Sequence, residues 1–175
     1  MEIAVRRAGV DDAGALSLVA RAAFLETYAH MIRVGDMLAH ARTLNDEGYF
    51  TRWAAQDETA LWLAETQPWG APIGYAALTT PDLPVPTGPQ DLELRRIYVL
   101  SRFHKTGTGA RLMQAACAEA SARGAARVLL GTNKHNATAL RFYERAGFAI
   151  VGERTFKVGE TLYDDFVLAR PVQAG

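Results

Sequence analysis

The stretch His104-Lys105-Thr106-Gly107-Thr108-Gly109 constrains the fold most, because it joins a strand-like run to an alanine-rich helix that ends near Gly124. Residues without Cβ let main-chain amides approach an anion closely, and the first amides of a helix have no partner within it. The positive end of the helix dipole adds to this preference for negative charge. We interpret the loop as a pyrophosphate site, although two such glycines can also make only a tight turn.

Two common nucleotide-binding motifs are missing from this context. A dinucleotide fingerprint would require a third glycine at position 112, which is Leu112, and the chain has no G-x-x-x-x-G-K-[ST] sequence. Rossmann-type and P-loop sites are therefore not expected.

Composition predicts one globular domain over residues 1–175, 49% of which are hydrophobic. The 19 basic residues, Lys and Arg, balance 19 acidic ones, so no general surface for nucleic acid or an anionic membrane is expected. Cys117 is the only cysteine, which excludes an internal disulfide and favours a packed small side chain. Because the N-terminus lacks a hydrophobic signal core and no run approaches a membrane span, we expect a cytoplasmic protein.

The first half of the chain alternates between strand-like and helix-like patterns. Its expected strands are 3–7, 61–65 and 73–79, and its expected helices are 13–30, capped by Asp11-Asp12, and 34–44, with a further turn at 50–55. The strands at 61–65 and 73–79 flank a turn and predict an antiparallel hairpin. The proline-rich segment 81–89 predicts a loop that could rim a site.

The strand at 92–100 changes its apolar parity midway. Leu92 and Leu94 occupy even-numbered positions, whereas Ile97 and Val99 occupy odd-numbered ones, so a regular strand would turn the two pairs to opposite faces. A β-bulge near Arg95-Arg96 would return all four side chains to one face, and a strand buried on both faces is the alternative.

The second half predicts a helix after the glycine loop, with an apolar stripe at Leu112, Ala116 and Ala120 and an end at Gly124. Further along we expect a strand at 128–132, a helix at 136–146 stopped by Gly147, and a strand at 148–151. A final hairpin is expected to pair 153–158 with 162–168 around Gly159-Glu160.

Three blocks in this order match a known family. They are Leu94-Arg95-Arg96-Ile97-Tyr98-Val99 with His104 to Gly109, Asn136-Ala137-Thr138-Ala139-Leu140-Arg141-Phe142-Tyr143, and Ala146-Gly147-Phe148. The chain resembles the GCN5-related N-acetyltransferases, whose loop reads Gln/Arg-x-x-Gly-x-Gly/Ala and whose later helix reads Asn-x-x-Ala-x-x-Phe-Tyr. Phe24 to Tyr28, Ile73-Gly74-Tyr75 and the ending 156–168 look like the polyamine-acetylating PaiA-type branch.

The resemblance implies an α/β (α+β) fold with a mixed, mostly antiparallel sheet of about seven strands, split at its middle and flanked by about four helices. It also implies acetyl-CoA as cosubstrate, with the backbone of Ile97, Tyr98 and Val99 pairing with the pantetheine arm like an added strand. The cofactor's diphosphate would lie on the loop, formed by His104, Lys105, Thr106, Gly107, Thr108 and Gly109. His104, Lys105 and Thr108 depart from the family pattern, which we expect to tune affinity because main-chain amides do most of the binding.

The family position of Tyr143 implies a general acid that protonates the departing thiolate, since a phenol stays protonated at neutral pH. A core aromatic is the alternative; Phe142 is expected to pack inward while Tyr143 faces the cleft. Glu93 resembles a base acting through water, Glu26 is a second candidate, and a solvated surface charge is the alternative for either. Asn136 is expected to cap its helix and to contact the pantetheine, or to cap alone.

We therefore predict direct acetyl transfer from acetyl-CoA to the primary amine of a small molecule, with a polyamine favoured and no covalent acyl-enzyme. A protein or peptide N-acetyltransferase and a non-catalytic acetyl-CoA-binding domain stay open as alternatives, as does a homodimer. His30, His40 and His135 lack metal-ligand spacing, so no metal is expected.

Overall fold

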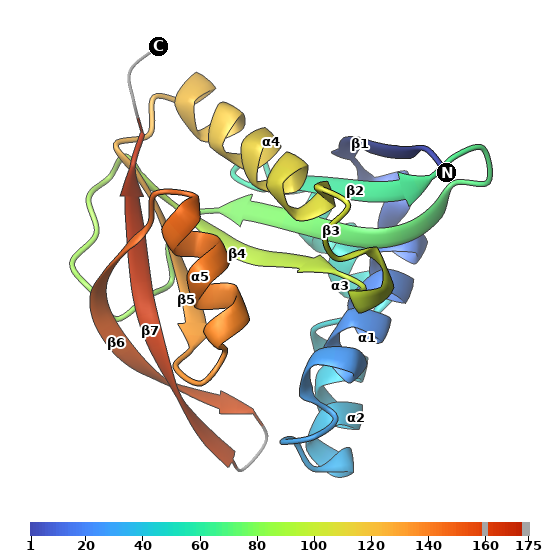
Figure 1. Cartoon of the computed structure of the whole chain (residues 1–175), viewed down its shortest axis with the longest axis horizontal. Helices are drawn as coiled ribbons and strands as arrows, with labels where there is room; N and C mark the ends of the chain where they lie inside the picture. The colour runs from blue at the N-terminus through green and yellow to red at the C-terminus, as the bar shows by residue number, and fades with distance from the viewer. Residues whose placement is uncertain (159–160, 173–175) are drawn as a thin grey trace.

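Figure 1 shows the computed structural model of the protein, in which residues 1–158 and 161–172 are described. The strands of these residues form one sheet in the order β1-β2-β3-β4-β5-β7-β6, and every neighbouring pair is antiparallel except β4 and β5. They are β1 (Ile3–Ala8), β2 (Ala60–Thr66), β3 (Ala71–Thr79), β4 (Asp91–Val99), β5 (Arg127–Asn133), β6 (Ala149–Val158) and β7 (Thr161–Pro171). This is the mixed, mostly antiparallel sheet that the resemblance implies.

Two layers of helices cover the sheet (Figure 1). One face carries α4 (Thr108–Ala122) and α5 (Ala137–Arg145); the other carries α1 (Ala13–Tyr28), α2 (Val34–Thr43) and α3 (Glu47–Ala54). Apolar side chains of α4 and α5 pack with β2, β3, β5 and β7 in the larger core, whereas α1 and α3 pack on the opposite face around Phe50 and Tyr75. The described residues thus contain five α-helices, one more than the expected number of about four.

The predicted bulge in β4 is confirmed. Ala77 pairs with Arg96, but the next residue, Leu78, pairs with Leu94, so Arg95 is the extra residue. Leu94 and Ile97 consequently share the core under α4, as the parity change predicts. The alternative of a plain strand buried on both faces is wrong.

The two arginines at the bulge are structural rather than part of a basic surface patch. The Arg96 guanidinium points under α3, where Nη1 donates to the Leu44 carbonyl at 3.0 Å and to Asn45 Oδ1 at 2.7 Å. It also lies over the Trp53 ring at 5.1 Å, a cation–π contact. Arg95 turns the other way and pairs with Glu93 at 3.0 Å.

β4 and β5 pair over only three residues, from Asp91 with Arg127 to Glu93 with Leu129. β5 pairs with β7 along its whole length, from Arg127 with Pro171 to Asn133 with Asp165, but beyond Leu129 it no longer pairs with β4. We call the region between the diverging ends of β4 and β5 the split. It lies at the middle of the sheet, where the resemblance places it.

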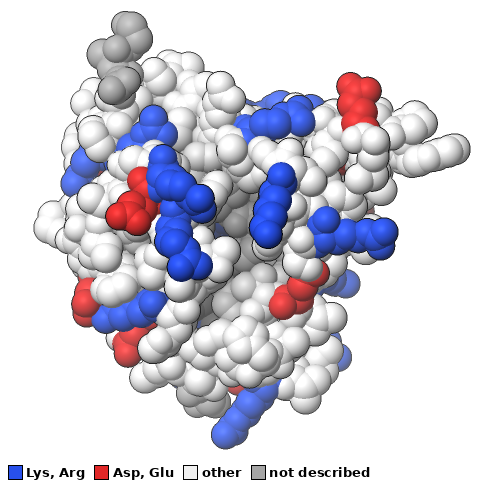
Figure 2. All heavy atoms as spheres, in the orientation of Figure 1, with Lys and Arg blue, Asp and Glu red and all other residues white. Residues whose placement is uncertain are grey.

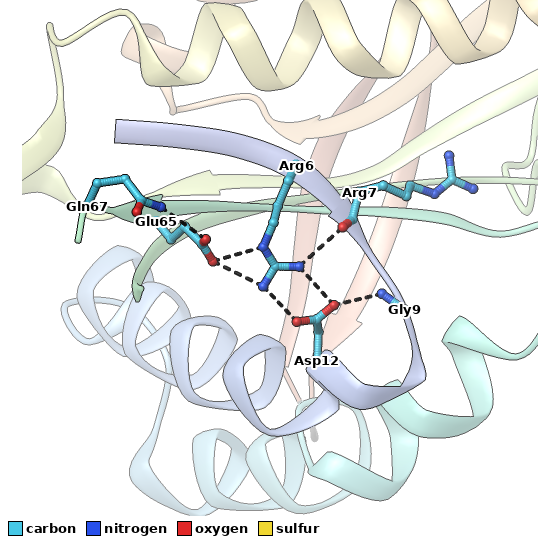
Figure 3. A network of polar contacts seen from close by, with 6 residues as sticks. All are labelled: Arg6, Arg7, Gly9, Asp12, Glu65 and Gln67. Carbon is cyan, nitrogen blue, oxygen red and sulfur yellow. Dashed lines mark hydrogen bonds and ion pairs between the residues drawn. The ribbon is translucent and has the colours of Figure 1, made fainter. Parts of the chain in front are cut away.

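The N-terminal cap of α1 differs from the expectation. Asp12 holds the cap position but makes no side-chain hydrogen bond to the helix, which ends at Tyr28 instead of residue 30. Figure 3 shows its carboxylate accepting two hydrogen bonds from Arg6, at 2.8 and 3.0 Å, and one from the Gly9 amide at 2.9 Å. Arg6 also donates to Glu65 at 3.1 Å, so this network joins β1, β2 and the start of α1.

Two other elements are longer than predicted. The turn expected at 50–55 is the helix α3, which begins at Glu47 because the Asp46 side chain caps the Tyr49 amide. The separate strands expected at 148–151 and 153–158 are the single strand β6, interrupted by a bulge between Ile150 and Gly152. The predicted turn at Gly159-Glu160 lies outside the described residues.

His40 of α2 makes folding stability depend on pH. Its ring stacks on Phe24 with centroids 4.0 Å apart, and burial, with the charge of Arg96 second, lowers the pKa of His40 from 6.5 to about 4. The unfolded chain therefore binds a proton below pH 6.5 that the folded chain does not bind until about pH 4. Stability contributed by neutral His40 is present above pH 6.5 and is lost as the pH falls toward 4.

We predict that the melting temperature of the wild type falls between pH 7.5 and pH 5 more steeply than that of His40→Gln. The measurement is thermal unfolding at several pH values, with His30→Gln as control because the His30 side chain is exposed. A His40→Gln variant with the wild-type slope would contradict this account.

Candidate active site

The loop before α4 presents a row of unused amides. Among the described residues, none of the main-chain N–H groups from Lys105 to Ala110 has a hydrogen-bond acceptor. Lys105 and Gly107 have positive φ angles of 65° and 79°, and Gly107 occupies the N-cap position of α4. Successive amides in such a conformation form a concave anion site, and the dipole of α4 reinforces it.

Side chains of the same loop hold it from the inside. The Thr106 hydroxyl donates to the Phe103 carbonyl at 2.7 Å and contacts the Thr108 hydroxyl at 2.7 Å. Thr108 is only 1% exposed, and His104 Nε2 lies 2.8 Å from the Val99 carbonyl oxygen. These three side chains fix the shape of the loop, whereas its amides are the groups left for an anion.

Basic side chains stand close to this loop. Figure 2 shows the front face hollowed between α5 and the segment that leads into α4, with Lys and Arg side chains on both sides of the hollow. Arg102, Lys105 and Arg111 are exposed near the loop, and Arg141 and Arg145 are exposed on α5. An anionic ligand can thus meet positive charge here although the chain has no net charge.

The edge of β4 beyond Glu93 is available for another strand. Leu100 donates to the Ile73 carbonyl at 2.9 Å, and Tyr98, two residues earlier, stands opposite Tyr75. By antiparallel alternation, Tyr98 turns its backbone groups toward β3, whereas Ile97 and Val99 turn theirs toward the split. The backbone of Ile97 and the Val99 amide therefore face the split, whereas the Val99 carbonyl already lies 2.8 Å from His104 Nε2 and the Tyr98 backbone is directed to β3.

Tyr143 of α5 lies at the boundary between the core and the split. It is 8% exposed and its ring packs edge-on against Phe148, with centroids 6.0 Å apart. Phe142 is half-buried, packs against the same core and lies 3.6 Å from the position that a Cβ on Gly109 would occupy, so it packs inward as expected, but Tyr143 is the more buried of the two. The Tyr143 ring belongs to the core, and only its hydroxyl is placed for chemistry.

The Tyr143 hydroxyl has no hydrogen-bond partner among the described residues, where every fully buried side-chain oxygen or nitrogen has one. The hydroxyl must therefore reach solvent. Burial, and secondarily the neighbouring phenol of Tyr98, raise the pKa of Tyr143 above its ordinary value. The group stays protonated at neutral pH and is available as a proton donor.

The two candidate bases are both engaged. Glu93 is 3% exposed, and Oε2 accepts from Arg95 Nη2 at 3.0 Å and from the Asp82 amide at 2.8 Å. Glu26 accepts from the hydroxyl and the amide of Ser101 at 2.6 and 2.7 Å, and these bonds lower the pKa of Glu26. Glu93 is the last residue of β4 that pairs with β5, so it lies where the split begins.

Asn136 caps α5 as predicted, because its Oδ1 accepts from the Ala139 amide at 3.0 Å. Its side-chain NH₂ is left for another partner.

Two residues near the split were not predicted. The Tyr28 hydroxyl of α1 lies 3.3 Å from the Tyr98 hydroxyl, and Asp165 of β7, 4% exposed, pairs with Arg154 at 3.1 Å. Tyr163, Asp165 and Val167 alternate with their neighbours and share one face of β7. This pattern could have identified Asp165, because a carboxylate on an inward face is rarely buried unless it is paired.

A groove of about 620 Å³ runs between α4, from Ala110 to Ser121, and the residues of α5 and the end of β7 that face it. Cys117 lies in it, half-buried, with Arg170 Nη1 3.6 Å from its sulfur, and burial raises the pKa of this thiol. The raised pKa argues against a reactive thiolate.

Two other kinds of feature are absent from the described residues. No three His, Cys, Asp or Glu side chains there come close enough together to hold a metal ion. None of the helices described is long and apolar enough to cross a membrane.

Comparison with known proteins matches the chain to the acetyltransferase (GNAT) family over residues 27–148. The protein therefore belongs to this family. An uncharacterized N-acetyltransferase of Mycobacterium tuberculosis is 42% identical over 101 residues, which cover 58% of this chain and 61% of that protein. The chain thus matches less than two thirds of the length of this relative.

The fold is also that of solved acetyltransferases. The crystal structure of the PaiA N-acetyltransferase from Thermoplasma acidophilum in complex with coenzyme A superposes with a TM-score of 0.79 at 19% identity, covering 98% of this chain and 99% of that one. An N-acetyltransferase from Staphylococcus aureus Mu50 superposes with a TM-score of 0.76 at 18% identity, covering 99% and 100% of the two chains.

Proposed function

We propose that the protein transfers an acetyl group from acetyl-CoA directly to the primary amine of a small molecule, with a polyamine-like acceptor favoured. The observation that carries the proposal is the convergence of three features on the split. These are the free amides of 105–110, the open edge at Ile97 and Val99, and the protonated hydroxyl of Tyr143. Family membership and the coenzyme A complex of the structurally similar PaiA protein support the same assignment.

Acetyl-CoA would bind as an extended chain along these features. Its diphosphate would accept hydrogen bonds from the loop amides, with Lys105 and Arg111 nearby as sources of positive charge. The pantetheine arm would pair with the backbone of Ile97 and Val99 like an added strand, and the Asn136 amide would help to hold it. This path ends with the thioester beside Tyr143.

The chemical step would be direct attack of the amine nitrogen on the thioester carbonyl carbon. The new C–N bond forms as the C–S bond breaks, the Tyr143 hydroxyl donates its proton to the departing thiolate, and the proton that the nitrogen then loses returns through water to the Tyr143 oxygen. The attacking nitrogen arrives as an ammonium and must lose its proton first. We assign this deprotonation to Glu93 acting through water. We prefer it to Glu26 because both oxygens of Glu26 accept hydrogen bonds from Ser101, and these bonds lower its pKa and make it a weaker base.

A small acceptor fits the far end of the split better than a peptide. The Tyr163 hydroxyl of β7 donates to the Met31 carbonyl at 3.0 Å, just after α1, and its ring packs with Phe24 and Ile32. This contact bridges the two halves of the sheet beside the acceptor region. An extended polypeptide crossing the split would have to break it, which disfavours the protein N-acetyltransferase alternative.

For the loop, we predict that Gly107→Ala raises the dissociation constant for acetyl-CoA roughly 10-fold, because an alanine at φ 79° costs about 1–2 kcal/mol and distorts the amide row. Isothermal titration calorimetry measures this. Gly124→Ala is the matched control, since Gly124 has a similar φ of 71° at the other end of α4. An equal loss of affinity in both variants would argue against the loop as the binding site.

For the acid, we predict that Tyr143→Phe lowers kcat roughly 10- to 1,000-fold and spares acetyl-CoA affinity, because it removes one proton donor and keeps the ring in the core. Release of free thiol from acetyl-CoA, measured with an amine panel that includes spermidine, gives kcat. Wild-type kcat in the variant would remove Tyr143 from the mechanism, and no thiol release by the wild type with any amine would favour a binding domain.

For the base, we predict that Glu93→Gln lowers kcat/KM roughly 100-fold at pH 7 and much less at a pH where the amine is already neutral. A purely structural role in holding Arg95 would lower activity equally at all pH values. The pH profile of kcat/KM therefore separates the two roles, and a variant whose profile runs parallel to that of the wild type would exclude Glu93 as the base.

A further inference from the structure

A buried carboxylate on the acceptor side of the split has one oxygen without a partner. Asp165 is 4% exposed, and its Oδ2 accepts from Arg154 Nε at 3.1 Å. Among the described residues no donor contacts Oδ1, and every fully buried side-chain polar atom there has a hydrogen bond. Oδ1 therefore reaches solvent, from a side chain that is otherwise enclosed.

Contacts of β7 place Asp165 beside the end of α1. Tyr163, two residues earlier on the same face of β7, donates to the Met31 carbonyl. Tyr28 packs with Tyr163 in one apolar cluster, its hydroxyl lies 3.3 Å from that of Tyr98, and the Asp165 charge helps to raise the pKa of both phenols. The carboxylate and these two phenols thus form one cluster drawn from α1, β4 and β7.

Arg154 does not cancel the capacity of Asp165 to bind a cation. Its guanidinium lies against the backbone of β5, so close that a Cβ on Gly131 would be 2.5 Å from Nη2. Arg154 is held there and has further interactions besides Asp165. Burial raises the pKa of Asp165 although Arg154 opposes this, which indicates a carboxylate with too few donors.

We propose that Asp165, together with Tyr28 and Tyr98, binds a second ammonium group of the acceptor, so that the preferred acceptor is a diamine or a longer polyamine. The distal ammonium would donate to Asp165 Oδ1 and lie against the phenols, which contribute oxygen acceptors and ring faces. The other amine of the same molecule would then reach the thioester beside Tyr143. This inference rests on the proposed acetyl transfer and adds the group that selects the acceptor.

The test compares 1,4-diaminobutane with butylamine, which has the same carbon chain and one charge fewer. Thiol-release kinetics of the wild type should give a kcat/KM at least roughly 30-fold higher for the diamine. Asp165→Asn should lower kcat/KM for the diamine roughly 10- to 100-fold, so that the ratio between the two amines approaches one. Asp164→Asn is the matched control, because Asp164 is the exposed neighbour on the same strand, and it should keep the wild-type ratio.

Three outcomes would overturn the proposal. They are a wild-type ratio near one, a wild-type ratio retained in Asp165→Asn, and a preference for β-alanine, whose carboxylate would instead point to Arg154. The wild-type ratio decides the matter even if Asp165→Asn does not fold. Tyr28→Phe, which removes one hydroxyl and keeps the ring, provides a second variant, and its ratio should also fall.

Binding without turnover separates this inference from the proposed function. Calorimetry of 1,4-diaminobutane against the protein saturated with coenzyme A should show binding that Asp165→Asn weakens roughly 10-fold or more, with butylamine binding poorly. Such binding without thiol release from acetyl-CoA would refute the catalytic function and leave the ammonium site in place. Thiol release with no diamine preference and no Asp165-dependent binding would refute the ammonium site alone.

Discussion

The extra residue in β4 is the feature on which the rest of the site depends. Without Arg95 as a bulge, Ile97 and Val99 could not return to the core face shared with Leu92 and Leu94. A bulge bends its strand and increases the local twist, and β4 pairs with β5 only up to Glu93, on the near side of the bulge. The split, its open backbone edge and the position of Tyr98 follow from this local irregularity.

The side-chain contacts of Arg95 and Arg96 hold the bulge in this state. Arg96 lies under α3, where it donates hydrogen bonds to the Leu44 carbonyl and the Asn45 side chain and makes cation–π contacts with three aromatic rings. Arg95 forms an ion pair with Glu93. A buried guanidinium without these partners would be costly, so the α2–α3 connection and β4 stabilise each other. The part of β4 that borders the split is therefore coupled to the packing of the N-terminal helices.

The parts of the fold that local patterns determine could be predicted from the sequence. The bulge follows from the parity of four apolar residues, and the amide loop follows from glycines between a strand and a helix. The Asn136 cap likewise needs only its own helix. The single strand β6 was predicted as two strands, because the bulge near Val151 breaks the alternation that marks a strand.

Features that depend on long-range contacts could not be predicted. The Asp12 carboxylate accepts hydrogen bonds from the Gly9 amide and from Arg6, and none from the amides of α1. This arrangement depends on Arg6, which also binds Glu65 of β2, a residue far away in the sequence. The Tyr28–Tyr98 contact joins α1 to β4, and Tyr163, on the same face of β7 as Asp165, contacts the residues just after α1; only the folded chain reveals these contacts. Similarly, helical spacing separates Phe142 from Tyr143 but does not say which of them is the more buried.

If the amides of 105–110 bind the diphosphate of coenzyme A, the sulfur of the coenzyme should lie beside Tyr143. A crystal structure of the protein with coenzyme A bound would show the position of both groups. We expect diphosphate oxygens within hydrogen-bonding distance of these amides, the pantetheine arm along Ile97 and Val99, and the sulfur next to the Tyr143 hydroxyl. Diphosphate density elsewhere on the protein, or no binding at millimolar coenzyme A, would contradict this expectation.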